Sequence, residues 1–159
     1  MGDQASSCYH KALYRLSVGD MTEAEMTEYL TDPKRKNTGF PEEVALQTVL
    51  RLREEGFLDD KRYLLRLVRR GDESLVGPRR LREELIRHRF PSRYVEAVMA
   101  RSVDYDHRAR KLLVQKGLDS ENLSTPAARK KAVDFLVRRG YSFGVASEAV
   151  RWISKEYSD

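Results

Sequence analysis

The chain has little of what builds extracellular or membrane proteins. Its 159 residues include a single cysteine, Cys8, so no internal disulfide can form. It has no run of about 18 apolar residues that could cross a bilayer. The N-terminus also lacks the basic and then apolar segments of a secretory signal. We therefore expect a cytoplasmic protein in a reducing compartment, with no membrane partner.

Residues that interrupt helices are few, and segments of alternating apolar and polar residues are missing. The sequence holds five prolines and nine glycines, and apolar residues recur at three- and four-residue spacing through most of its length. This periodicity is typical of amphipathic helices. We predict an all-α protein of about nine helices. The predicted helices lie near 8–18, 22–31, 42–55, 60–70, 78–88, 92–102, 105–116, 126–138 and 143–156.

Three aromatic residues indicate an internal repeat of about fifty residues. Phe40, Phe90 and Tyr141 are spaced by 50 and 51 residues, and each precedes a predicted helix start. Leucines stand five residues before the second and third of them, and an inserted loop displaces the corresponding Leu30 in the first copy. The chain thus fits three three-helix repeats. Their predicted bounds are 1–58, with a flexible N-terminal tail, 59–103 and 104–159.

The segment "EGFLDDKRY" is interpreted as a joint between helices. Gly56 suits a left-handed residue that ends a helix, and Asp59 or Asp60 suits the N-cap of the next helix. Gly71 and Gly140 are predicted to end helices in the same way. Two neighbouring aspartates are too few for an oxygen-rich metal site, which is the less favoured alternative.

No catalytic, metal or cofactor site is predicted. His10, His88 and His107 are scattered over three helical units, and Gly-rich phosphate loops are absent. Asp104 in "DYDH" suits an N-cap better than a metal ligand. Trp152 falls on an apolar stripe with Ile153 and is predicted to be core.

Charge is distributed unevenly. The net charge is −5 over residues 1–60, +7 over 61–101 and +3 over 102–159, for a total of +5. This asymmetry favours a polyanion or an acidic protein surface as the partner of the central and C-terminal thirds.

The helix predicted in "GPRRLREELIRHRF" buries Leu81 and Leu85 and exposes arginines on the opposite face. A purely solvated face is the alternative, because its arginines can pair with Glu83 or Glu84 at four-residue spacing. We expect a set of cations to bind the polyanion or acidic protein surface. They are Arg69, Arg70, Arg79, Arg80, Arg82, Arg87, Arg89, Lys130, Lys131, Arg138 and Arg139, with a further loop contact at Lys34, Arg35 and Lys36.

Three stretches together resemble the RecX family of bacterial recombinase regulators. They are "GFLDDKRY" at 56–63, "GPRRLREEL" at 77–85 and "FLVRRGYSFGVASEAV" at 135–150. The resemblance covers roughly residues 8–157. It departs from the family pattern just before Gly77, where a basic stretch is usual and this chain has Asp72 and Glu73.

This resemblance implies an elongated, curved stack of the three repeats without enzymatic activity. It also implies binding in the groove of the RecA nucleoprotein filament, which limits filament growth or promotes disassembly and so suppresses strand exchange, ATP hydrolysis and LexA cleavage. Weaker, sequence-independent binding to single- and double-stranded DNA, as a monomer, is expected as well. The alternatives are a helix-turn-helix DNA-binding protein and a helical-repeat adaptor for an acidic protein.

Overall fold

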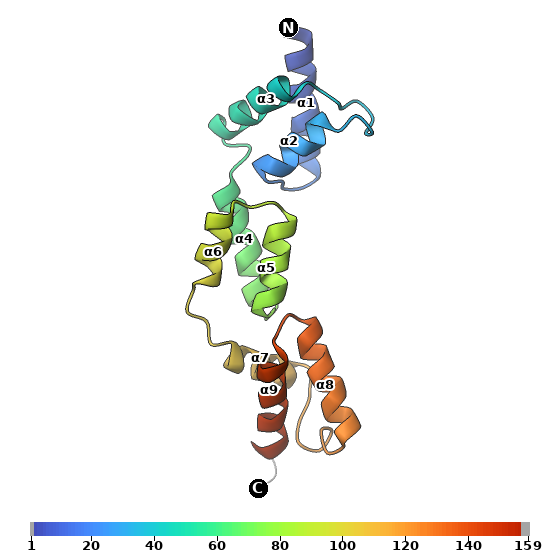
Figure 1. Cartoon of the computed structure of the whole chain (residues 1–159), viewed down its shortest axis with the longest axis vertical. Helices are drawn as coiled ribbons and strands as arrows, with labels where there is room; N and C mark the ends of the chain where they lie inside the picture. Colours follow the sequence, from blue (N-terminus) through green and yellow to red (C-terminus); the bar gives the residue numbers. More distant parts are fainter. Residues whose placement is uncertain (1, 157–159) are drawn as a thin grey trace. The chain divides into compact units, whose positions relative to one another are not determined.

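The computed structural model describes residues 2–156, which form nine α-helices and no strand (Figure 1). The helices are α1 (Gly2–Val18), α2 (Glu23–Thr31), α3 (Glu42–Glu54), α4 (Asp60–Glu73), α5 (Pro78–Arg87), α6 (Ser92–Met99), α7 (Tyr105–Gln115), α8 (Pro126–Arg138) and α9 (Phe143–Glu156). The predicted all-α class and number of helices are therefore confirmed over the described range.

Two helices are longer than predicted. Helix α1 begins at Gly2, so the segment predicted as a flexible tail is helical from that residue on. Helix α4 runs through Gly71 to Glu73. Gly71 is buried, and a Cβ atom there would lie 3.1 Å from Cγ2 of Val76, so this glycine serves close packing and does not end the helix. Met1 and residues 157–159, the ends of the first and third predicted repeats, lie outside the described residues.

The chain packs as two compact units. Unit 1 comprises Met1–Leu67 with Leu85–Tyr94, and unit 2 comprises Val68–Glu84 with Val95–Asp159. Helices α4, α5 and α6 each contribute residues to both units. The three repeat boundaries predicted from the sequence differ from this division and stay a prediction.

The core of unit 1 lies among α1, α2 and α3. Met26 and Leu30 of α2 and Leu52 of α3 are fully buried there, together with Cys8 of α1. Burial raises the pKa of the Cys8 thiol, so this cysteine is a small apolar core residue without thiolate character.

The start of α2 in unit 1 is capped from two directions. Thr22 and Glu25 form a capping box, in which each side chain accepts a hydrogen bond from the other residue's backbone nitrogen. The Asp60 carboxylate accepts a further hydrogen bond, 2.9 Å, from the backbone nitrogen of Glu23. Asp59 instead caps its own helix, accepting from the backbone nitrogen of Arg62 at 3.0 Å. The acidic pair of the joint therefore caps two different helices.

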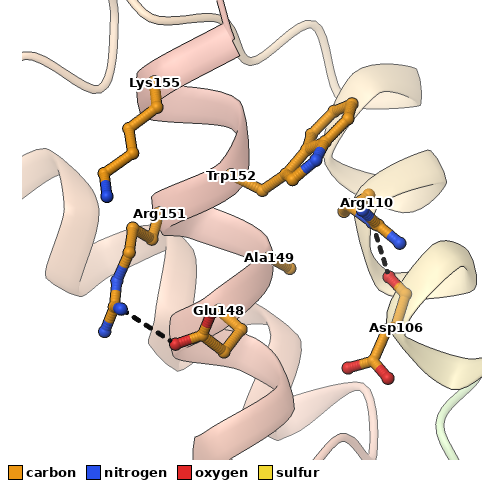
Figure 2. Close-up of a pocket in the computed structure, with 7 residues that line it drawn as sticks. All are labelled: Asp106, Arg110, Glu148, Ala149, Arg151, Trp152 and Lys155. Atoms are coloured by element: carbon orange, nitrogen blue, oxygen red, sulfur yellow. Dashed lines mark hydrogen bonds and ion pairs between the residues drawn. The ribbon is translucent and has the colours of Figure 1, made fainter.

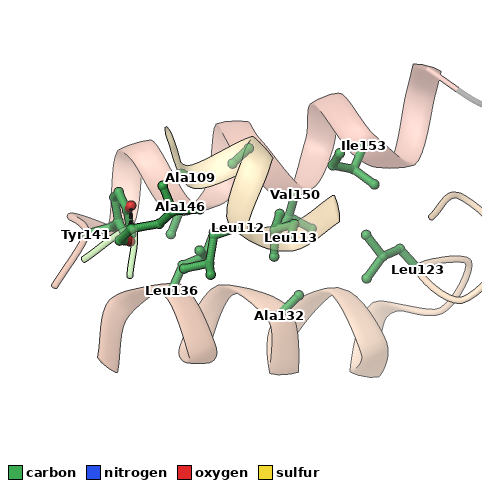
Figure 3. Close-up of a cluster of buried hydrophobic side chains, with 12 residues drawn as sticks. Ala109, Leu112, Leu113, Leu123, Ala132, Leu136, Tyr141, Ala146, Val150 and Ile153 are labelled. Atoms are coloured by element: carbon green, nitrogen blue, oxygen red, sulfur yellow. Dashed lines mark hydrogen bonds between the residues drawn. The ribbon is translucent and has the colours of Figure 1, made fainter. Parts of the chain in front are cut away.

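The core of unit 2 is enclosed by α7, α8 and α9 (Figure 3). Leu113, Leu136 and Ile153 are completely buried, each from a different helix. The prediction that Trp152 belongs to this core is wrong. Its side chain is 41% exposed, because α9 turns Ile153 inward and leaves the preceding residue at the edge of the buried stripe.

In the structure, each copy of the predicted repeat contains the same kind of turn before its aromatic residue. In each copy the aromatic residue donates its backbone N–H to a buried leucine carbonyl: Phe40 to Leu30 at 2.9 Å, Phe90 to Leu85 at 3.3 Å and Tyr141 to Leu136 at 3.1 Å. The residue before each aromatic has a positive φ, 83° at Gly39, 61° at Arg89 and 101° at Gly140. In the first copy the bond to Leu30 closes the base of the inserted loop.

In unit 2 the turn before Tyr141 packs directly against the turn before α5, at what we call the glycine junction. The backbone nitrogens of Gly77 and Arg79 donate to the carbonyls of Arg139 and Gly140, at 2.8 and 3.1 Å. A Cβ atom on Gly140 would lie 2.5 Å from Cβ of Arg80 and 2.6 Å from its backbone nitrogen. Only glycine allows this approach, since backbone atoms cannot move aside as a flexible side chain can.

Side chains hold the loop between α4 and α5 to the rest of unit 2. Leu75 has a φ of 56°, which is strained for a bulky residue. The buried Tyr141 hydroxyl donates to the Leu75 carbonyl at 2.6 Å, and burial keeps it protonated by raising the pKa of Tyr141 far above its usual range. Arg108 donates to the carbonyl of Val76 and to Asp72. These bonds fix a loop whose own backbone conformation is unfavourable.

Replacing Gly140 with alanine is expected to lower the free energy of unfolding by about 3 kcal/mol or more, because the new methyl group meets the α5 backbone at a positive φ. The matched control is Gly144→Ala in α9, where nothing lies within 4 Å of the added carbon. It should stay within about 0.5 kcal/mol of wild type. Urea unfolding followed by circular dichroism measures both, and equal stability of the two variants would contradict the close approach.

Replacing Asp72 with asparagine is expected to lower stability by about 1 kcal/mol at pH 7, a modest loss because the carboxylate is 35% exposed and solvent screens it. The bidentate hydrogen bond from Arg101, and then the bond from Arg108, hold the pKa of Asp72 below its usual range. The stabilisation is therefore present above the ordinary aspartate pKa and is lost as the pH falls through the lower, folded-state value.

We expect the stability difference between wild type and Asp72→Asn to be constant from pH 7 to about pH 5 and to shrink below about pH 4. Urea titrations at each pH measure it, with the exposed neighbour Glu73→Gln as control. A difference independent of pH would argue against the ion pairs as its cause.

Candidate anion-binding site

Helix α5 presents arginines to solvent, as its sequence predicts. Pro78 opens the helix, and Leu81 and Leu85 are fully buried on one face. Arg80, Arg82 and the other cations of this segment are exposed. Within residues 2–156 the arginines of α5 make none of the predicted four-residue pairs with Glu83 or Glu84, so the alternative of a self-neutralised face is not supported.

The glycine junction brings two basic motifs of the sequence together. The start of α5 carries Arg79 and Arg80, and the end of α8 carries Arg138 and Arg139. The backbone contact through Gly140 places the α8–α9 turn against Arg80. Residues about sixty positions apart thus form one basic cluster in unit 2.

Two of these four arginines serve the structure. Arg79 donates through Nη2 to the carbonyl of Val137, and Arg139 donates through Nη2 to the carbonyl of Ser74. Arg139 is half-buried, and its Nε is enclosed without a hydrogen-bond acceptor. Both guanidinium groups therefore satisfy carbonyls at the ends of α8 and α4. Each uses one guanidinium nitrogen, Nη2, in this way, and the expectation that both arginines bind an anion stays a prediction.

The other two arginines point their charge to solvent. Arg80 and Arg138 are exposed and form no ion pair among the described residues. The same holds in unit 2 for Arg69, Arg70 and Lys131, and in unit 1 for Arg87. Unpaired guanidinium groups offer the planar donor fork that fits phosphate and carboxylate oxygens.

The remaining predicted cations make surface ion pairs. Arg82 pairs with Glu96 at 2.9 Å, Arg89 with Glu28 at 3.0 Å and Lys130 with Asp134 at 3.6 Å. Such exposed pairs contribute about 0–1 kcal/mol, so a stronger anion can displace the carboxylate.

The basic loop of unit 1 is partly neutralised. Arg35 pairs with Asp32 at 3.2 Å and lies 5.6 Å from the centre of the Tyr29 ring. The Lys34 and Lys36 side chains are exposed. Sequence periodicity did not predict the pairing of Arg35, because it depends on a loop conformation.

Asp72 is one of the two acids that depart from the family pattern before Gly77. Its charge is shared by Arg101 at 3.0 Å and Arg108 at 3.0 Å. The sequence did not predict Arg101 and Arg108 as partners of Asp72. They lie 29 and 36 residues further along the chain, and no local spacing indicates the pairing. Glu73 is the exposed acid that remains beside the junction.

Acidic and histidine clusters do not form a metal site in the part of the chain that the structure describes. Asp104 caps α7 by accepting from the backbone nitrogen of His107, as predicted. His88 Nδ1 lies 3.2 Å from the Glu25 carboxylate, and His10 bonds within its own helix. None of the described helices is long and apolar enough to span a membrane.

This chain is similar to curated proteins over most of its length and of theirs. The regulatory protein RecX of Trichlorobacter lovleyi is 37% identical over 146 residues, which cover 87% of this chain and 90% of that protein. The regulatory protein RecX of Stenotrophomonas maltophilia is 32% identical over 143 residues, covering 89% and 84%. No protein-family model matches the chain.

Solved structures agree with the fold. The crystal structure of RecX from Lactobacillus salivarius matches with a TM-score of 0.70 over 96% of this chain and 98% of that one, at 19% identity. A crystal structure of regulatory protein RecX matches with a TM-score of 0.68, at 23% identity, over 94% of this chain and 72% of that one. Because the curated relatives exceed 30% identity over nearly their whole length, the chain belongs to the RecX family of regulatory proteins.

Proposed function

We propose that this chain modulates the RecA recombinase by binding RecA–DNA filaments in their groove, where it limits filament growth or promotes disassembly. Strand exchange, ATP hydrolysis and LexA cleavage are suppressed as a result. The observation that carries this proposal is membership of a family of regulatory, non-enzymatic proteins over most of the chain. That the protein is located in the cytoplasm and that it is a monomer remain predictions.

The exposed cations supply the binding chemistry. Arg80 at the glycine junction and Arg138 at the end of α8 are exposed in unit 2, and Arg87 is exposed in unit 1. Phosphates of DNA and carboxylates on RecA are both suitable acceptors for guanidinium groups. Because both units carry such groups, two linked contacts raise the overall avidity without requiring strong binding at either.

DNA contact by these residues is proposed to be weaker than filament binding and independent of sequence, on single and double strands alike. A helix-turn-helix protein reads base edges with the N-terminal residues of its recognition helix. Here the carbonyls of Arg139 and Gly140 accept the backbone N–H groups at the N-terminus of α5, so these N–H groups are not available to DNA phosphates. The Arg79 and Arg80 side chains at this end are exposed, so the helix-turn-helix alternative is tested by a binding preference for one duplex sequence.

Adding the protein to preformed RecA filaments on single-stranded DNA should lower their ATPase rate and strand exchange in proportion to the protein added. A coupled ATPase assay and a strand-exchange assay measure these effects. Unchanged rates at excess protein would reject the proposal. If binding to RecA alone persists while no DNA is bound at low salt, the adaptor alternative is favoured.

The double variant Arg80→Ala, Arg138→Ala should weaken inhibition of the filament ATPase several-fold, because it removes two unpaired guanidinium groups without breaking a bond described in the fold. If both arginines contact phosphate, the slope of log K for duplex binding against log salt concentration should become shallower by about 1.8. The double variant Lys61→Gln, Lys111→Gln removes equal charge elsewhere and serves as control. Equal loss in both double variants would mean that total charge matters and the junction does not.

A further inference from the structure

Trp152 is exposed in a place where the sequence pattern predicts core, and its surroundings are those of a binding site. It lines a pocket of about 690 Å³ between α7 and α9 in unit 2 (Figure 2). The Arg110 guanidinium lies 4.8 Å from the centre of its ring. The side chain remains 41% exposed, so the arginine leaves much of the indole accessible.

The cations of this pocket stand on both sides of α9. Figure 2 shows Trp152 and Arg110 on one side of α9 and Arg151 and Lys155 on the other. The pocket also contains two acids. Glu148 pairs with Arg151 at 3.1 Å in an exposed contact of small energy. Asp106 lies in the first turn of α7, where it complements the helix dipole.

A second groove, of about 380 Å³ between α8 and α9, continues the basic surface. It shares Arg151 and Lys155 with the tryptophan pocket and adds Arg129 and Lys130. Among the described residues that line this groove, none is acidic. Arg151 and Lys155 therefore line both the aromatic pocket and a groove that has basic side chains together with Val133 and Val150.

We propose that this surface, Trp152 with Arg110, Arg151 and Lys155, binds single-stranded DNA by stacking one unpaired base on the indole and holding the neighbouring phosphates on the two α9 cations. An aromatic platform within a basic groove is the arrangement used by proteins that bind single strands without reading sequence. The inference rests on the proposed DNA contact and names its substrate as a single strand.

The observations favour a single strand over two other polyanions. A duplex keeps its bases stacked on one another, so it reaches the cations and leaves the indole bare. An acidic peptide finds the same cations, yet its carboxylates make no use of an aromatic face beside Glu148 and Asp106. An unpaired base makes use of both the exposed ring and the neighbouring positive charge.

The chain contains one tryptophan, so its intrinsic fluorescence reports directly on this pocket. Titrating the full chain with a short oligothymidylate at low salt should quench Trp152 fluorescence along the same curve that anisotropy of labelled oligothymidylate gives for binding. A duplex of the same length should bind with much less quenching.

Substitutions test the stacking itself. Trp152→Leu should weaken oligothymidylate binding by about five- to 100-fold, the effect of truncating one stacking side chain, whereas Trp152→Phe should retain most of the affinity. Phe143→Leu is the matched control, because Phe143 is an exposed aromatic at the start of the same helix, outside the pocket, and its loss should leave binding unchanged. Circular dichroism shows whether each variant is folded.

Binding without quenching, together with wild-type affinity of Trp152→Leu, would overturn the inference while leaving DNA binding and filament inhibition intact. Equal quenching by polyglutamate would also overturn it and assign the pocket to acidic peptides. Absence of any DNA binding would reject the inference and the DNA contact together, and the filament ATPase then tells separately whether RecA modulation survives.

Discussion

The backbone approach at the glycine junction is the constraint on which unit 2 depends. Because Gly77 and Gly140 carry no side chain, the start of α5 reaches the turn after α8 and the two exchange backbone hydrogen bonds. The same approach satisfies N–H groups that every helix start leaves unpaired. It also holds the strained Leu75 in place through Tyr141. The glycine junction therefore allows the close packing, caps the start of α5 and supports the strained loop.

The junction also decides which arginines are available to a partner. Arg79 and Arg139 each donate a hydrogen bond to a backbone carbonyl, while Arg80 and Arg138 are exposed and form no ion pair among the described residues. In each motif two neighbouring arginines look alike in the sequence, and the fold gives them different roles. A partner that meets this surface encounters a smaller and more fixed set of charges than composition suggests.

The sequence predicted the features that depend on local spacing. Helix periodicity, the N-cap at Asp104 and the leucine before each repeat aromatic are set mostly by nearby residues, and all appear in the structure. Contacts between distant segments were not predictable in this way. The pairing of Asp72 with Arg101 depends on how α4 meets the connection between α6 and α7, and the exposure of Trp152 depends on how α7 packs on α9; no spacing within one helix encodes either.

The first repeat turn has a consequence for labelling the protein. The Leu30 carbonyl accepts from the backbone nitrogens of both Gly39 and Phe40, at 3.0 and 2.9 Å, so the loop between them is tied off at its base. The side chains of residues 34–37 are exposed. A fluorophore or a short peptide tag grafted at the loop tip should therefore leave the helices intact, and it would report on the predicted loop contact at Lys34, Arg35 and Lys36.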